Sequence, residues 1–194
     1  RPDVDPAQLA IKRNGDEIRG YLALWGSPDL TDLDTEYFTP ETDFWDSVIG
    51  KAIRPLTWDH AVDKATKADP IIGRITEVGD DAIGRWYTAQ LDKSHKYRKV
   101  IDRLIEQGAI GTSSDSAPQY VLREQRGKAV WLKRWPLFAA ALTPTPCEPR
   151  MSGSIDFVKS LGITLPDPEA PQEAARFPVE NARMRLNLLK LLED

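Results

Sequence analysis

The chain has 194 residues, 41% of them hydrophobic and 29% charged, and a formal net charge of −4 at pH 7. This balance is typical of one soluble domain with a substantial core. Interleaved charges give no basic field for nucleic acid or anionic lipid, and no apolar run approaches the roughly 20 residues that span a bilayer. We therefore expect no nucleic-acid partner and no membrane partner.

The first half of the chain alternates strand patterns with one helix pattern. Strands are expected at residues 17–26, 55–58, 71–76 and 84–91, the last two paired around a turn at 79–81. Thr39 and Pro40 resemble a helix start. The helix would end near Gly50 and bury four apolar residues: Phe44, Trp45, Val48 and Ile49.

The second half contains the clearest helix pattern, residues 94–107, with Gly108 as its expected stop. A strand through the serine cluster at 112–116 should follow, then a hairpin of residues 120–122 against 130–132. Residues 136–143 predict a buried strand, and residues 152–161 a short helix. Many short strands with few helices favour a mainly antiparallel α+β fold, a sheet closed or nearly closed on itself with helices outside.

Four segments are expected in the chain: an N-terminal extension at 1–15, the domain at 16–160, a Pro-rich linker at 161–178, and a C-terminal amphipathic helix at 179–194. The leucines of the last helix require a partner surface in the same domain or in a second copy. Because the sequence begins with Arg1 rather than Met and shows no signal peptide, we expect a processed or trimmed chain. A single cysteine, Cys147, fits a reducing compartment and is not expected to act as a nucleophile.

The serine cluster is the main candidate for chemistry. A serine hydroxyl is a poor nucleophile until a base takes its proton, and His60, about fifty residues upstream, is the one suitable base that the sequence offers. Two histidines and one cysteine do not support a structural zinc site, and no Gly-rich phosphate loop is present. We therefore expect no metal and no cofactor.

Several segments, in order, resemble the prohead maturation proteases of tailed bacteriophages. They include Trp58-Asp59-His60 followed by Ile72-Gly73-Arg74-Ile75, then Gly108-Ala109-Ile110-Gly111-Thr112-Ser113-Ser114, and finally Leu142-Thr143-Pro144-Thr145-Pro146. The resemblance covers roughly residues 18–150. The herpesvirus assemblins are similar more distantly. This resemblance implies an assemblin-like β-barrel surrounded by helices, with serine-protease chemistry.

The resemblance assigns His60 as general base and Ser113 as nucleophile. Ser114 is the fallback nucleophile, because a slip of one residue on a strand turns a side chain to the opposite face. The phage family usually has an acidic residue on the strand after the hairpin, where this chain has Ala139. The possible substitutes for this third member are Asp59, Asp63, Asp115, Glu148 and His95, and the sequence favours none of them.

The resemblance implies a serine endopeptidase that cleaves scaffold and major-capsid-protein segments, and itself, inside the assembling procapsid in the host cytoplasm. Self-association, as a dimer, is also expected from the similarity to assemblins. The main alternative is the same fold, catalytically disabled at Ala139, acting as a structural or scaffold component of the procapsid. A third possibility is a small β-barrel binding module without chemistry.

Overall fold

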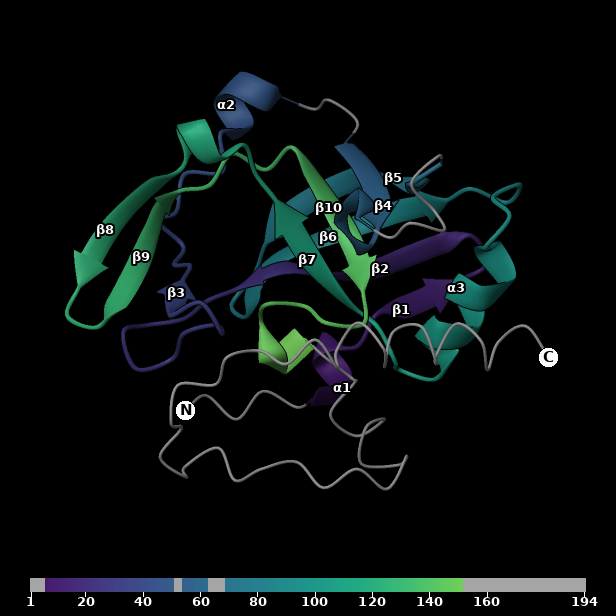
Figure 1. Cartoon of the computed structure of the whole chain (residues 1–194), viewed down its shortest axis with the longest axis horizontal. Coiled ribbons are helices and arrows are strands. Elements are labelled where there is room, and N and C mark those ends of the chain that lie inside the picture. The colour runs from purple at the N-terminus through teal and green to yellow at the C-terminus, as the bar shows by residue number, and fades with distance from the viewer. Residues whose placement is uncertain (1–5, 51–53, 63–68, 152–194) are drawn as a thin grey trace. The chain divides into compact units, whose positions relative to one another are not determined.

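The computed structural model describes residues 6–50, 54–62 and 69–151, all within one compact unit spanning residues 1–158 (Figure 1). The strands of this unit are β1 Lys12–Asn14, β2 Glu17–Leu24, β3 Glu36–Tyr37, β4 Arg54–Trp58, β5 Ile71–Asp80, β6 Gly84–Leu91, β7 Gly111–Asp115, β8 Leu122–Arg126, β9 Ala129–Arg134 and β10 Ala139–Thr143. The helices are α1 Pro6–Leu9, α2 Asp46–Ile49 and α3 Arg98–Glu106, with short 3₁₀ turns η1 Asp59–Ala61, η2 Pro118–Tyr120 and η3 Pro149–Met151.

The larger sheet has seven strands in the order β1-β2-β6-β5-β4-β10-β7, and β3, β9 and β8 form a second, smaller sheet. All neighbours in the larger sheet are antiparallel except β4 and β10, which run parallel. The sheet curls so that β2 and β7 pack against each other, although no hydrogen-bonded ladder joins them (Figure 1). The predicted α+β fold with mainly antiparallel strands is confirmed.

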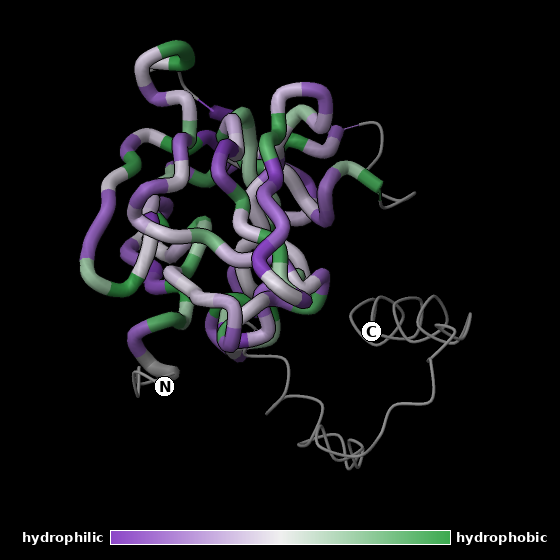
Figure 2. Tube along the Cα trace, turned by 90° about the vertical axis from the view of Figure 1, so that its left-hand side faces the viewer, coloured by the Kyte–Doolittle hydropathy of each residue, from purple (hydrophilic) through white to green (hydrophobic). Residues whose placement is uncertain are grey.

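The core lies inside this curled sheet, and α3 closes part of it. Residues of β6 alternate between buried and partly exposed positions, as expected for a strand with one face in the core. Hydrophilic and hydrophobic stretches accordingly interleave along the trace (Figure 2). The phenol of Tyr87, which is fully buried, bonds Thr112 Oγ1 at 2.9 Å and so ties β6 to β7 across the interior.

Two buried arginines connect α2 to the larger sheet. Arg54 and Arg85 are 4% and 3% exposed, and both reach Asp46, at 3.3 and 2.5 Å. Arg54 Nε also donates to the carbonyl oxygen of Leu137 at 2.6 Å, and the Arg85 guanidinium lies 4.5 Å from the ring centroid of Phe44. This network fixes the start of α2 against β4 and β6.

The helix predicted after Thr39 is wrong in extent and in burial. Only Asp46–Ile49 is helical, none of its residues is buried, and Val48 is 66% exposed. The reason lies in Asp43, whose backbone bonds Lys133 and Trp135 as an extended segment. Trp45 then turns the chain with a φ of +62°, so Phe44 is buried from a loop rather than from a helix.

The helix pattern at 94–107 is confirmed as α3, but the helix begins at Arg98. The residues before it form a turn, in which the Asp92 carboxylate accepts from Ser94 N and Oγ. His95, in this turn, is buried at 5% exposure, with Nε2 3.0 Å from the Asp69 carbonyl oxygen. Gly108 ends the helix with a φ of +63°, as its position predicts.

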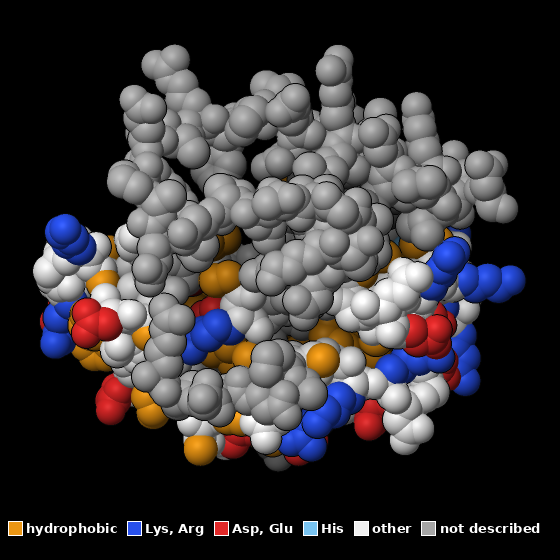
Figure 3. All heavy atoms as spheres, turned by 90° about the horizontal axis from the view of Figure 1, so that it is seen from below, with side chains coloured by type: hydrophobic (Ala, Val, Ile, Leu, Met, Phe, Trp, Pro, Cys, Tyr) orange, Lys and Arg blue, Asp and Glu red, His pale blue; other side chains and the backbone are white. Residues whose placement is uncertain are grey.

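The strands predicted from the sequence are present, with shifted bounds. Lys12–Asn14, within the expected N-terminal extension, pairs with β2 and joins the sheet. The helix predicted at 152–161, the linker at 161–178 and the helix at 179–194 lie outside the described residues. No described helix has the length and apolar character needed to cross a membrane. On the face drawn in Figure 3, acidic and basic side chains lie among one another on the described part.

Candidate functional site

Three neighbouring strands bring together the predicted nucleophile and the predicted base. β10 lies between β4 and β7, with Ala141 paired to Thr57 on one side and to Ser113 on the other (Figure 1). His60 follows β4 by two residues, in the turn η1, and this turn packs on β10. His60 and Ser113 thus lie on segments that both border β10.

The turn that carries His60 has an unusual backbone. Asp59, His60 and Ala61 have φ values of +43°, +56° and +60°, in the left-handed region. This conformation costs L-residues other than glycine about 1–2 kcal/mol each, so the surrounding contacts must hold it in place. One of these contacts is from Thr143 Oγ1, which donates to Asp59 Oδ1 at 2.7 Å. Strain of this kind concentrates at functional sites, which makes the turn a candidate.

The imidazole of His60 is hydrogen-bonded to a carboxylate of β7. His60 Nδ1 lies 2.5 Å from Asp115 Oδ1, and both side chains are 33% exposed. A carboxylate at this nitrogen holds the proton on Nδ1 and leaves Nε2 as the basic atom of the ring. The charge of Asp115 also stabilises the protonated ring. His60 is thus held in the tautomer that a general base requires.

The alternation of β7 decides which serine shares a face with this pair. Successive strand residues point to opposite faces, so Ser113 lies on the face of Asp115, with their Cα atoms about 6.7 Å apart. Thr112, whose hydroxyl is buried against Tyr87, marks the opposite face, and Ser114 shares it. The strand register therefore favours Ser113 over the fallback Ser114 as the partner of His60.

The other candidates for the third member have different surroundings. Ala139 is the cross-strand partner of Asp115, so its methyl group lies beside the carboxylate that reaches His60. Glu148 forms an ion pair with Arg150 at 2.5 Å, and His95 contacts Asp69. Asp59 binds Thr143 as described, and Asp63 lies outside the described residues. Among these candidates, Asp115 is the one that the structure shows bonded to the His60 ring.

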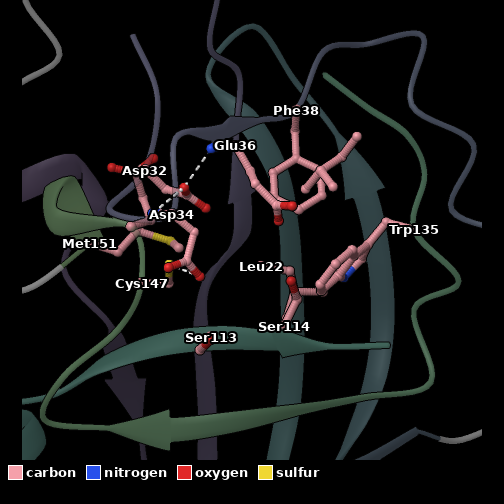
Figure 4. Close-up of a pocket in the computed structure, with 12 residues that line it drawn as sticks. Leu22, Asp32, Asp34, Glu36, Phe38, Ser113, Ser114, Trp135, Cys147 and Met151 are labelled. Carbon is pink, nitrogen blue, oxygen red and sulfur yellow. Dashed lines mark hydrogen bonds between the residues drawn. The ribbon is translucent and has the colours of Figure 1, made fainter. Parts of the chain in front are cut away.

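A pocket of about 190 Å³ opens beside β7, opposite β10 (Figure 4). Its walls are partly apolar and partly acidic. They comprise Leu22, Asp32, Asp34, Glu36, Phe38, Ser113, Ser114, Leu132, Trp135, Cys147, Glu148 and Met151. Both serines thus border a cavity large enough for one amino-acid side chain. No sequence pattern predicted this pocket, although Asp32 and Asp34 alternate with Glu36, the first residue of β3.

Two groups of the pocket have shifted pKa values. Burial raises the pKa of Asp32 to about 6, although its carboxylate accepts from the backbone N–H groups of Glu36 and Asp34, both at 2.9 Å. Burial, together with the charges of Asp32 and Asp34, raises the pKa of the Cys147 thiol to about 12. The thiol donates to Asp34 Oδ2 at 3.3 Å. Cys147 is therefore a poor nucleophile at neutral pH.

In the described part of the chain, no group of three or more His, Cys, Asp or Glu side chains is arranged to hold a metal ion. The face of β7 that bears the Ser113 hydroxyl also bears the Asp115 carboxylate, which bonds the His60 imidazole. Their arrangement can support nucleophilic chemistry by the hydroxyl.

Comparison with known proteins gives distant similarity to solved structures. No protein-family model and no curated protein matches the chain. Among solved structures, the KSHV protease in complex with a hexapeptide phosphonate inhibitor is similar, at 15% sequence identity and a TM-score of 0.39. The similarity covers 66% of this chain, and the chain spans 58% of that protease. At this distance the similarity carries no conclusion about activity, substrate or partners.

Proposed function

We propose that this chain is a serine endopeptidase in which Ser113 is the nucleophile, His60 the general base and Asp115 the residue that orients His60. The observation that carries the proposal is the bond of His60 Nδ1 to Asp115 Oδ1, at 2.5 Å, on the face of β7 that also bears Ser113. A nucleophile, a base and an orienting acid are the groups that acyl transfer requires. The strained turn at His60 supports the same assignment.

In this reaction His60 Nε2 takes the proton of the Ser113 hydroxyl while Ser113 Oγ attacks the scissile carbonyl carbon. The tetrahedral intermediate collapses when the protonated imidazole gives its proton to the leaving amine, and an acyl-enzyme remains. Water, deprotonated by the same imidazole, then hydrolyses the ester. Asp115 keeps its charge throughout and stabilises the imidazolium form of His60. Backbone N–H groups near Ser114 are the proposed donors to the oxyanion.

The substrate is an extended peptide that pairs with β7. Within the described residues β7 is the last strand of the larger sheet and pairs with β10 alone. The free edge of such a strand presents backbone N–H and C=O groups to an added strand. A peptide in this position places a backbone carbonyl near Ser113. The same edge borders the pocket, which supplies room for a side chain of the peptide.

The biological setting rests on the resemblance in sequence to phage prohead proteases. It implies cleavage of scaffold and capsid-protein segments, and of the chain itself, inside the procapsid. The alternative is a disabled protease fold with a structural role in the procapsid, and the presence of Ala139 favours it because the family's usual acid is missing from β10.

The test is covalent labelling by a fluorophosphonate probe, followed by mapping of the modified residue by mass spectrometry. We expect labelling of Ser113 in the wild-type chain, none in Ser113→Ala, and unchanged labelling in the matched control Ser114→Ala. Labelling should also fall strongly in His60→Gln, whose fold is checked by its circular dichroism spectrum and Tm. A wild-type chain that remains unlabelled would contradict the proposal and support the structural alternative.

A further inference from the structure

The pocket beside β7 has a composition that the proposed reaction does not use. Its apolar wall includes Leu22 and Leu132, each 1% exposed, and the rings of Phe38 and Trp135, which meet edge to face at 5.7 Å. Carboxylates of the segment before β3 lie on the other side, and in Figure 4 this acidic group and Trp135 stand on opposite sides of the cavity above β7. The pocket thus pairs apolar surface with negative charge.

Two of the four carboxylates already have cationic partners. Glu36 pairs with Arg123 and Glu148 with Arg150, both at 2.5 Å. Asp32 and Asp34, by contrast, form no ion pair with a lysine or arginine of the described part. They are two residues apart and repel each other, and this repulsion contributes to the raised pKa of Asp32. A cation placed between them would relieve the repulsion.

The indole of Trp135 belongs to the apolar wall of this pocket. Its Nε1 atom is buried and has no hydrogen-bond partner among the described residues, so an occupant of the pocket meets carbon atoms of the ring. Carbon atoms of an aromatic ring pack well against the aliphatic part of a long side chain. The charged group that the pocket lacks is therefore a cation at the two aspartates.

We propose that this pocket binds a lysine or arginine side chain of the peptide substrate, at a position that flanks the scissile bond. The aliphatic part of such a side chain fits the wall of Leu22, Phe38 and Trp135, and its charged end reaches the aspartates. The nucleophile Ser113 and its neighbour Ser114 border the same cavity, so the basic residue lies close to the bond that is cut. This inference rests on the proposed function, whose substrate class it names.

The test measures binding separately from catalysis. The Ser113→Ala variant is titrated with fluorescent octapeptide pools that are random except for one central position, occupied by lysine, norleucine or glutamate. Binding is followed by fluorescence anisotropy at low ionic strength. We expect the lysine pool to bind at least about tenfold more tightly than the norleucine pool, and the glutamate pool to bind most weakly. Equal binding of the lysine and norleucine pools would overturn the inference.

A charge-matched pair of variants locates the preference. Asp32→Asn with Asp34→Asn removes two charges from the pocket, whereas Asp29→Asn with Glu77→Gln removes two exposed charges that lie outside the pocket lining. We expect the first pair to abolish the lysine preference and the second to retain it. Preference that survives the first pair would place the basic subsite elsewhere. Because these measurements use Ser113→Ala, they stand apart from fluorophosphonate labelling, which tests the proposed function itself.

Discussion

Asp115 and Ala139 lie directly opposite each other on β7 and β10, and the carboxylate of Asp115 reaches His60 Nδ1 at 2.5 Å. Position 139, where the resemblance to phage prohead proteases predicts an acid, holds alanine, and its cross-strand neighbour Asp115 bonds the imidazole instead. Cross-strand Cβ atoms are about 4.5–5.5 Å apart, so an acid at either position can serve one imidazole. Loss of the acid from β10 does not by itself leave His60 without a partner.

Asp115→Asn is expected to lower the rate of Ser113 labelling or peptide cleavage by about 10³–10⁴-fold, because an amide allows the wrong tautomer of His60. The fold should persist, since the side chain keeps its shape and is one-third exposed. The measurement is the labelling rate at pH 7.5, with Tm as the control for folding.

The double variant Asp115→Asn with Ala139→Glu should recover part of this loss. The new carboxylate stands on the neighbouring strand, within reach of the same ring. Recovery requires a longer side chain to cross from β10, so we expect it to be incomplete. Asp115→Asn with an unchanged rate would show that the bond to His60 has no role in catalysis.

Local patterns in the sequence predict the strands and name the candidate residues, but they do not predict how these segments are arranged in space. Alternation in β6 and the glycine stop of α3 follow from local patterns, and the structure confirms both. The predicted burial of Val48 failed because Asp43 pairs with residues about ninety positions away, and no local pattern encodes that contact. Similarly, Asp115 was one of several acids, and only the register of β7 on β10 separates it from the others.

The two-residue spacing of Ser113 and Asp115 does carry a signal, because it places both on one face of any strand. The sequence does not predict that η1 packs on β10. The small side chains of Ala139 and Ala141 on the outward face of β10 leave space there, and only a three-dimensional arrangement reveals what occupies it. The same limit applies to the pocket, whose walls come from five separate segments of the chain.

The raised pKa of Asp32 predicts a stability that depends on pH. The folded pKa of about 6 lies above the ordinary value of 3.8, so the folded chain binds more protons than the unfolded chain between these values. The contribution of Asp32 to the free energy of unfolding should therefore fall as pH rises from about 4 to about 6, and then level off. Asp32→Asn keeps the oxygen that caps the loop but lacks this contribution.

The measurement is the free energy of unfolding in urea for Asp32→Asn and wild type at pH 4, 5, 6 and 7. The difference, variant minus wild type, should grow between pH 4 and 6. Asp34, Glu36, Glu148, Arg150 and Cys147 also face this region and are present in both proteins, so their titration largely cancels. A difference that is constant over this range would contradict the assigned burial of the carboxylate.

The buried arginine network predicts a large loss of stability for Arg85→Ala. The substitution leaves Asp46 and Asp80 without the guanidinium that bonds them at 2.5 and 3.0 Å, and removes the contact with Phe44. Loss of hydrogen bonds to charged groups costs about 1.5–3 kcal/mol, and the two carboxylates left behind are half exposed, so no buried charge adds to this cost. Urea unfolding measures it, and Arg126→Ala, whose ion pair with Glu124 is exposed on both sides, is the control, with an expected loss below about 1 kcal/mol. Similar losses in the two variants would show that the buried network contributes no more to the free energy of unfolding than an exposed ion pair does.

The Cys147 thiol should react slowly with iodoacetamide. A pKa of about 12 leaves roughly 10⁻⁴ of the thiol ionised at pH 8, against about a quarter for a free cysteine. The alkylation rate in the folded chain should therefore be about 10³-fold below that of glutathione, and it should rise to the ordinary rate in urea. Fast alkylation in the folded state would show that the thiol is outside the acidic pocket.

The strained turn at His60 leads to a prediction in which stability and activity move in opposite directions. Ala61 has a φ of +60°, a conformation that glycine adopts without steric cost. Ala61→Gly removes about 1–2 kcal/mol of strain and adds about 0.4–1 kcal/mol of chain entropy to the unfolded state, so the variant should be slightly more stable than wild type. Ala82→Gly, in a turn without a positive φ, supplies the control and should be less stable.

The same freedom should loosen the imidazole. With glycine at position 61 the turn can leave the conformation that brings His60 Nδ1 to Asp115, so Ser113 should be labelled more slowly even though the chain unfolds at a higher temperature. The comparison of labelling rate with Tm for the two glycine variants checks this. If Ala61→Gly raised Tm and left labelling unchanged, the strain would have no part in positioning His60. If it lowered both, as Ala82→Gly lowers Tm, the turn would be held by contacts that tolerate no other residue, and strain would not be its defining feature.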